Sequence, residues 1–203
     1  MSEELKQNIS FDRQIEETEI EKKLSIPAKR LMEKLEPIPS KSEFLKYRWF
    51  WELVQNASDF NDKVDIIVEE TENQLIFKHN GQPFKLVDVE NLITPDSDKD
   101  DNEIDKDYIG RFGSGFISTH VLSSSIDIKG IAKDKYKDNV YHQFNFNLDR
   151  SNYDNKLKLI DSIKESEKQF KSNHQVEAHI PGTFETSFTY NLTKGLANIN
   201  PKE

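Results

Sequence analysis

Apolar residues recur every three or four positions in several segments of the chain, and this spacing predicts helices. Helices are expected over 24–35, 42–60 and 156–170, with a helix or turn over 86–94. Elsewhere, β-branched or alternating apolar residues predict antiparallel strands. These form a hairpin over 64–81 and further strands over 125–131, 139–148, 174–180 and 183–190. The pattern therefore predicts a chain that mixes helices with an antiparallel sheet.

The first 36 residues are highly charged, and their apolar residues are sparse. Four residues in the second half of this segment keep helical spacing: Leu24, Ala28, Leu31 and Leu35. Pro27 fits the start of a short amphipathic helix, because the first turn leaves its N–H groups unpaired anyway. We interpret 1–36 as a helical arm, either a plain surface helix or one that binds a partner or a second copy, ahead of a domain over 37–203.

The helix expected over 42–60 begins with a capping box, Ser40 followed by Glu43, and is apolar around most of its surface. Its exception is a polar stripe made of Arg48, Glu52, Asn56 and Asp59. At about 100° per residue, the last three lie within an arc of roughly 60°. Burying such groups unpaired is costly, so something polar must meet them. An ion-pair network with Arg48 or with a neighbouring strand is one solution, and a bound ligand is another.

A glycine run, Gly-Arg-Phe-Gly-Ser-Gly-Phe over 110–116, directly precedes an apolar helical segment. Glycines let the backbone turn tightly and approach a ligand, and the amides at a helix start can bind an anion such as phosphate. A Walker loop is excluded because no Gly-Lys-Ser/Thr follows. A Rossmann unit is excluded because no strand–helix–strand repeat surrounds the run. The alternative is an ordinary turn.

Two weaker signals flank these segments. His-Asn-Gly-Gln-Pro-Phe over 79–84 ends a strand, and Asn-Gly favours a turn with positive φ. Pro181-Gly182-Thr183 places a hydroxyl just inside a late strand. Each of them alone fits an ordinary turn.

The amino-acid composition limits the classes of partner and of chemistry that the chain can have. The 203 residues include 37 acidic and 28 basic side chains, for a formal charge of −9, which disfavours binding to nucleic acid or to an anionic membrane. The absence of cysteine excludes disulfides and thiol chemistry. No apolar run reaches the ~18 residues that span a membrane, and the N-terminus lacks a signal-peptide core. We therefore expect a cytoplasmic protein.

In this order, the four segments resemble the GHKL ATPases, whose nucleotide-binding unit is called the Bergerat fold. The stretch 52–59 looks like the family's first motif, Glu-x-x-x-Asn-x-x-Asp, and the glycine run is very similar to the third motif of the ninety-kilodalton heat-shock chaperone. The 79–84 segment takes the place of the second motif, and Pro-Gly-Thr resembles the fourth. The likeness spans roughly 40–190 and implies a two-layer α+β sandwich. We expect a mixed, mostly antiparallel sheet with helices on one face.

The resemblance implies ATP and Mg²⁺ as cofactors and gives roles to the first motif. Glu52 would activate the attacking water, and Asn56 would bind magnesium through its carbonyl oxygen. Asp59 matches the aspartate of chaperone and MutL members. Sensor histidine kinases lack the glutamate base, and the chain shows no phosphoacceptor helix, so the kinase interpretation is disfavoured.

The other motifs supply the rest of the implied nucleotide site. The residues implied for the phosphates form the glycine run: Gly110, Arg111, Phe112, Gly113, Ser114, Gly115 and Phe116. Thr183 would help to hold the adenine. The segment of about 94–109 stands where the family has its ATP lid, and seven carboxylates and two lysines over 96–107 predict a solvated, mobile loop. Ser97 and Lys99 within it could reach the nucleotide or stay solvated.

The second motif departs from the family at His79, where an aspartate usually accepts a hydrogen bond from the adenine amino group. A neutral imidazole can accept such a bond and an imidazolium cannot. Asn80, ahead of Gly81, could accept it instead, and Pro83 replaces the motif's last glycine. This variant resembles the sacsin-type branch of the family.

The resemblance thus implies an ATP-binding domain with slow, Mg-dependent hydrolysis that acts as a conformational switch in a longer protein. Its implied partners are further domains of that protein and a second copy in a nucleotide-dependent homodimer. The alternative is a module that senses nucleotide or binds proteins without hydrolysis. His79 and the lack of an obvious second domain favour the alternative, and Glu52 opposes it.

Overall fold

Six antiparallel strands form a single sheet in the computed structural model, which describes residues 3–58, 63–95, 114–176 and 178–192. The strands are β1 (Ile66–Glu70), β2 (Gln74–His79), β3 (Ser125–Lys133), β4 (Tyr141–Asp149), β5 (His174–Val176) and β6 (Thr186–Asn191). Their order is β1-β2-β6-β3-β4-β5, so the last strand inserts between two hairpins. The mostly antiparallel sheet that the sequence predicted is confirmed: the strand pairs are antiparallel, and the parallel pairing in the described residues is an isolated bridge between Phe84 and Ala132.

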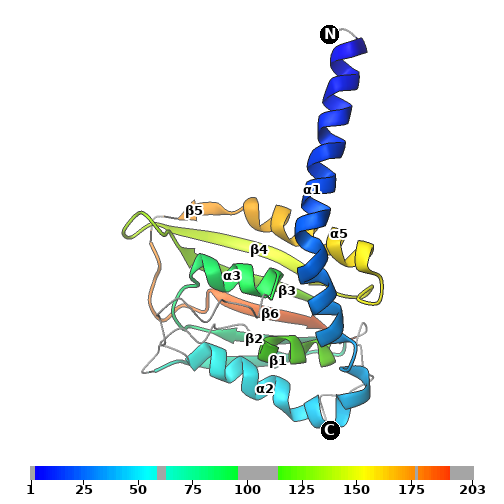
Figure 1. Ribbon diagram of the computed structural model, residues 1–203. Coiled ribbons are helices and arrows are strands. Elements are labelled where there is room, and N and C mark those ends of the chain that lie inside the picture. The colour runs from blue at the N-terminus through cyan, green and yellow to red at the C-terminus, as the bar shows by residue number, and fades with distance from the viewer. Residues whose placement is uncertain (1–2, 59–62, 96–113, 177, 193–203) are drawn as a thin grey trace, which may run out of the picture.

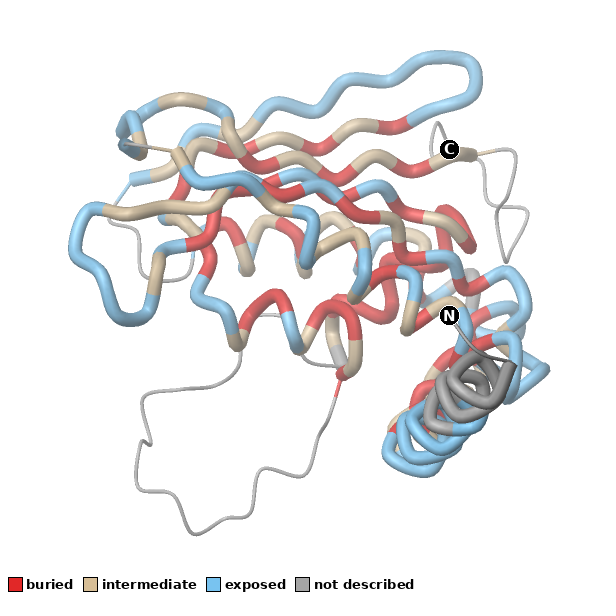
Figure 2. The backbone as a smooth tube through the Cα atoms, turned by 90° about the horizontal axis from the view of Figure 1, so that it is seen from above, coloured by how far each residue is buried: buried red, intermediate tan, exposed pale blue. Residues whose placement is uncertain are grey.

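The helices gather on one side of the sheet, which gives the two layers that the sequence predicted (Figure 2). They are α2 (Ser42–Ser58), α3 (Leu86–Ile93), the short α4 (Ser114–Ile117) continued by a 3-10 helix (Ser118–Val121), and α5 (Lys156–Lys171). The predicted start of α2 at residue 42 is confirmed. Ser40 lies two residues earlier in a 3-10 helix (Pro39–Lys41), where its hydroxyl donates to the Pro37 carbonyl at 3.0 Å.

The core lies between the two layers, as the alternating burial of the central strands requires. Ile126 and Ile128 of β3 and Phe188 of β6 face the helices and are fully buried. Phe116 of α4 packs on Phe188 with ring centroids 5.5 Å apart, and Leu53 of α2 is buried in the same cluster. The glycine run therefore leads into a helix that the core fixes against the sheet.

Helix α1 (Glu3–Leu35) is longer than expected: 33 residues run through Pro27 without a break (Figure 1). The short helix predicted to start at Pro27 is therefore wrong. Proline removes one hydrogen bond inside a helix, and burial of the helix's second half offsets that loss. Over residues 14–35 of this helix, the buried ones are the four that the spacing identified, Leu24, Ala28, Leu31 and Leu35. In the described part of the chain, no helix is both long enough and apolar enough to cross a membrane.

Two late strands are shorter than predicted. The strand expected over 174–180 ends at Val176, and the strand expected from 183 begins at Thr186. A turn at Gly182, with φ of 89°, lies between them. Thr183 therefore lies in this turn and not inside β6, because the chain reverses at the Pro-Gly pair.

A buried arginine ties the helical layer to the sheet at the end of β4. The Arg150 guanidinium donates to the Ile93 carbonyl at the end of α3 (2.8 Å) and to the Ser162 hydroxyl of α5 (3.1 Å). Burial lowers the pKa of Arg150 to about 10, although Asp149 raises it in part. Burial, together with the charge of Arg150, lowers the pKa of His120 to about 3. His120 is therefore neutral at physiological pH, and Arg150 is the cation of this region.

Candidate functional site

Glu52 of α2 lies directly against the glycine run. A Cβ added to Gly115 would stand 2.0 Å from Glu52 Oε2 and 2.7 Å from its carboxyl carbon. Only glycine leaves room for a carboxylate at that position. The structure thus brings together the first and third of the sequence segments, which the chain keeps far apart.

Arg48 shares the carboxylate of Glu52. Its Nε donates to Glu52 Oε1 at 2.7 Å, one helical turn away. The Glu52 side chain is 16% exposed and that of Arg48 is 48% exposed, so the pair lies at the edge of the site. The ion pair that the sequence left open is therefore present. It engages Oε1, while Oε2 faces Gly115.

Asn56 follows Glu52 by one turn, and its amide nitrogen is buried without a hydrogen-bond partner in the described residues. Two other buried atoms there share this state, the hydroxyls of Thr119 and Tyr190, which lie beside each other in the core. Leaving a buried amide unpaired costs about 1–3 kcal/mol. The unmet amide therefore indicates that a polar group belongs next to Asn56. Asp59, the fourth residue of the stripe, lies outside the described residues.

Only the end of the glycine run can be placed. Gly115 and Phe116 belong to α4, together with the backbone of Ser114, and the Ser118 hydroxyl donates to the Gly115 carbonyl at 2.6 Å. The other implied phosphate-binding residues, Gly110, Arg111, Phe112 and Gly113, lie outside the described residues. So do Ser97, Lys99 and nearly all of the predicted lid over 94–109.

His79 bonds within its own turn, whereas Asn80 bonds to Asp65, which directly precedes β1. His79 Nδ1 accepts the Gly81 N–H at 3.1 Å, so the neutral ring carries its proton on Nε2. Asn80 Oδ1 accepts the Asp65 N–H at 2.7 Å, and its Nδ2 donates to the Asp65 carboxylate at 3.0 Å. The expected positive φ of the Asn-Gly pair is corrected, because the positive φ values in the described residues belong to Asn139 and Gly182. The two hydrogen bonds between Asn80 and Asp65 hold the turn although neither Asn80 nor Gly81 has a positive φ.

The buried threonine beside His79 is Thr186 and not Thr183. The Thr183 hydroxyl donates to the Ile180 carbonyl at 2.7 Å inside the turn. Thr186 is buried at the start of β6 and pairs with His79 across the sheet. The sequence analysis did not name Thr186. The alternation of Thr186, Phe188 and Tyr190 is the signal that could have placed it on the inward face.

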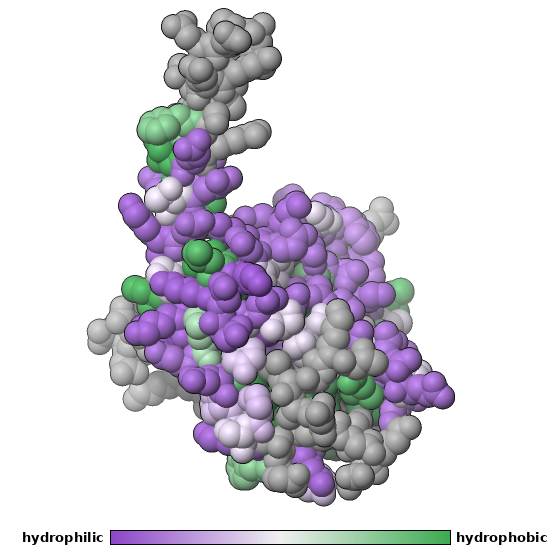
Figure 3. Space-filling model, turned by 90° about the vertical axis from the view of Figure 1, so that its right-hand side faces the viewer, coloured by the Kyte–Doolittle hydropathy of each residue, from purple (hydrophilic) through white to green (hydrophobic). Residues whose placement is uncertain are grey.

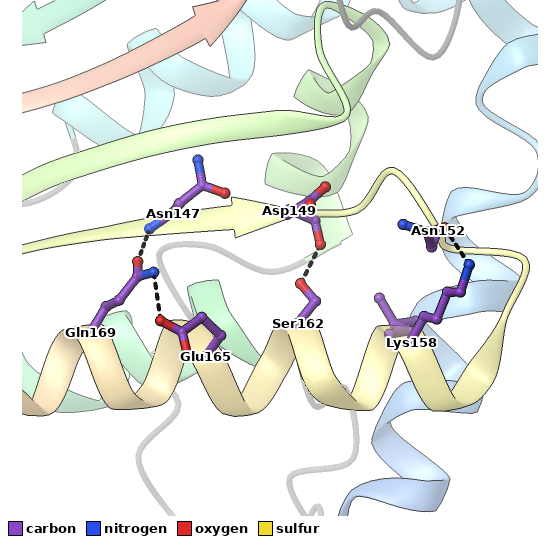
Figure 4. Close-up of a pocket in the computed structure, with 8 residues that line it drawn as sticks. Asn147, Asp149, Asn152, Lys158, Ser162, Glu165 and Gln169 are labelled. Carbon is purple, nitrogen blue, oxygen red and sulfur yellow. Dashed lines mark hydrogen bonds between the residues drawn. The ribbon is translucent and has the colours of Figure 1, made fainter.

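A separate polar cavity of about 200 Å³ lies between β4 and α5 (Figure 4). Gln169 accepts from the Asn147 N–H at 2.8 Å and donates to Glu165 at 3.1 Å. Lys158 donates to Asn152 at 3.3 Å, and the Ser162 hydroxyl donates to the Asp149 carbonyl. These side chains bond to one another and join the strand to the helix. The cavity is therefore best explained as part of the packing of α5.

Comparisons with known proteins add no relative: no family model matches the chain, and neither does any curated protein. The structural features that bear on function are the contact between Glu52 and Gly115 and the unpaired amide nitrogen of Asn56.

Gly115→Ala tests the close contact with Glu52. We expect the substitution to lower the free energy of unfolding by about 1–3 kcal/mol, because the new methyl overlaps the carboxylate. In a Glu52→Ala background the same substitution should cost less than about 1 kcal/mol, because the obstructing group is gone. Urea unfolding of the four proteins measures the coupling. Equal costs in both backgrounds would show that the two residues do not touch.

Proposed function

We propose that the chain is an ATP-binding domain that slowly hydrolyses ATP with magnesium. The proposal rests mainly on the position of the Glu52 carboxylate, which lies against Gly115 of the glycine run. This contact supports the proposal because a water-activating acid and a phosphate-binding turn must adjoin for attack on a terminal phosphate. The amide nitrogen of Asn56, one turn further along α2, is a buried donor without a partner, which supports the presence of an acceptor such as a phosphate oxygen beside it.

The residues fit magnesium and a triphosphate by their chemistry. Asn56 would hold the metal, which takes few protein ligands beside phosphate and water and would neutralise phosphate charge. Glu52 would orient a water molecule and accept its proton, and α2 keeps the two side chains on one face. The backbone from Ser114 to Phe116 would contribute amides without steric hindrance from a side chain at Gly115.

A second candidate is a nucleotide-sensing or protein-interaction module that does not hydrolyse ATP. The Arg48–Glu52 ion pair favours it, because Arg48 occupies one oxygen of the carboxylate that would have to accept the proton of water. The hydrogen bonds from the Gly81 N–H to His79 and from the Asp65 N–H to Asn80 favour it as well, because they engage both proposed adenine acceptors. Under either candidate we propose a cytoplasmic domain that works with further domains and with a second copy, and that does not bind nucleic acid or membrane.

Binding of a non-hydrolysable ATP analogue to the full chain, with and without Mg²⁺, tests the proposal. Asn56→Ala should raise the dissociation constant about tenfold or more with magnesium, and much less without it, because the metal ligand is lost. Gln55→Ala, an exposed neighbour on the same helix, is the matched control and should bind like the natural chain. If the natural chain binds no analogue, both candidates that use nucleotide are wrong. Equal losses with and without metal would remove the metal role of Asn56.

A further inference from the structure

A cavity of about 600 Å³ lies at the end of the sheet where the turn between β3 and β4 meets the start of α3. Both segments lie on the left of Figure 1. The cavity is lined by Lys85, Leu86, Val87 and Glu90 and by the turn residues 133–136. None of these residues belongs to the site around Glu52 and Gly115. The volume is that of a small-molecule site, and the proposed function does not account for it.

The backbone holds two lysines of this cavity side by side. The Phe84 N–H donates to the Ile131 carbonyl at 2.8 Å, and the Lys133 N–H donates to the Phe84 carbonyl at 2.9 Å. These bonds form the parallel bridge between Phe84 and Ala132, so Lys85 and Lys133 are the next neighbours across it. Like charges in opposite positions of paired strands destabilise the pairing. A bound anion beside both lysines would offset that cost.

The aspartate of the turn is already engaged by the turn itself. Asp134 Oδ1 accepts the N–H groups of Tyr136 and Lys137 at 2.8 and 3.0 Å. Its Oδ2 lies 3.1 Å from Nε2 of His142. Within the part of the chain that the structure describes, neither Lys133 nor Lys135 makes an ion pair. The turn therefore presents cations to the cavity while its carboxylate is bonded elsewhere, in a chain whose formal charge is −9.

An aromatic ring stands beside these cations. Tyr136 is 86% exposed, and Nζ of Lys135 lies 5.6 Å from the centroid of its ring. Leu86 and Val87 add aliphatic walls, and Leu86 is 37% exposed. On the opposite side of the molecule, by contrast, hydrophilic residues cover most of the described surface (Figure 3). Cations next to an exposed ring and aliphatic walls suit a ligand that joins an acidic group to a flat apolar ring.

We propose that this cavity binds an organic anion, a carboxylate or a phosphate ester that carries an aromatic ring. Lys133 and Lys135 bind its acidic group, with Lys85 beside them. Tyr136 stacks on the ring, which also contacts the aliphatic walls. The site shares no lining residue with the proposed nucleotide site, so it stands or falls independently of ATP hydrolysis.

Titration of the full chain with two probes, followed by NMR of the backbone amides, tests the site. The probes are 1-naphthyl phosphate and 1-naphthaleneacetate, which share one ring and differ in the acidic group. At least one of them should shift the amides of 85–87 and 133–136 with a dissociation constant of about 1 mM or lower. The tighter probe identifies the acidic group. Naphthalene-1-methanol, which has the ring alone, should bind at least about tenfold more weakly, because it lacks the charge. If neither anion shifts these amides, or if the alcohol binds as tightly, the proposal is wrong.

Substitutions in the turn separate the two parts of the site. Combining Lys133→Gln with Lys135→Gln should raise the dissociation constant of the anion about tenfold or more, because both charged donors are lost. Lys137→Gln is the matched control, since Lys137 is exposed in the same turn but does not line the cavity. Its effect should be small.

Tyr136→Ala should raise the dissociation constant about threefold or more, because the stacking surface is lost. Tyr47→Ala is its control, because Tyr47 is 61% exposed on α2 and does not line the cavity. All of these positions are exposed, so every variant should keep the natural amide spectrum outside its own surroundings. Equal effects of the double variant and of Lys137→Gln, or an unchanged affinity of Tyr136→Ala, would overturn the proposal.

Discussion

Replacing Glu52 with glutamine is expected to lower phosphate release from ATP at least about 100-fold. The amide keeps the size of the carboxylate beside Gly115 but cannot accept a proton from water, and a positioned general base is worth about 10²–10⁴ in rate. Binding of a non-hydrolysable analogue should change by less than about threefold, because the contact with the glycine run is preserved. Phosphate release under single-turnover conditions and titration with the analogue measure the two quantities.

Glu90→Gln, an exposed glutamate of α3, is the control and should match the natural chain in both assays. Equal release by the natural chain and by Glu52→Gln, at the background level and with binding retained, would contradict hydrolysis. It would favour the nucleotide-sensing alternative, in which the Arg48 ion pair holds the carboxylate.

Truncating Arg150 is expected to cause the largest loss of stability. Arg150→Ala should lower the free energy of unfolding by about 3–5 kcal/mol, because it leaves a cavity and removes the donors to Ile93 and Ser162. Arg150→Met should cost less, since it fills the volume and removes a buried charge. Urea unfolding of the natural chain and of both variants, fitted with one shared m-value, measures the free energies of unfolding to be compared.

Lys168→Ala, at an exposed position on α5, is the control for the loss of a cation and should cost less than about 0.5 kcal/mol. If Arg150→Ala costs no more than this control, the guanidinium does not join α3 to α5. If Arg150→Ala and Arg150→Met lower the free energy of unfolding equally, the lost hydrogen bonds account for the cost and the lost volume does not.

The elements that the sequence predicted correctly are those with a strong period. The helix from residue 42, the hairpin before His79 and the helix of 156–170 follow directly from 3.6-residue and two-residue spacing. Helix α1 was predicted too short because Pro27 is read locally as a start, whereas packing of the residues around it decides. Local signals cannot show that tertiary burial outweighs one lost hydrogen bond.

The candidate site could be predicted only in part, because helical periodicity shows which residues share a helix face but not what that face contacts. Helical spacing aligned Glu52 with Asn56, but the position of Glu52 beside Gly115 followed from the resemblance and not from any period. The tautomer of His79 depends on the Gly81 N–H, and the inward position of Thr186 depends on where the preceding turn ends. Arg150 gave no signal at all, because a charged residue at a strand end is usually exposed and its burial depends on partners from α3 and α5.

A crystal structure of the full chain with a non-hydrolysable ATP analogue and magnesium tests the central claim most directly. We expect the triphosphate between α2 and α4, with the Asn56 carbonyl oxygen on the metal and Glu52 facing the terminal phosphate. An analogue bound elsewhere, or a metal with Glu52 and Asn56 both outside contact distance of the triphosphate, would contradict it.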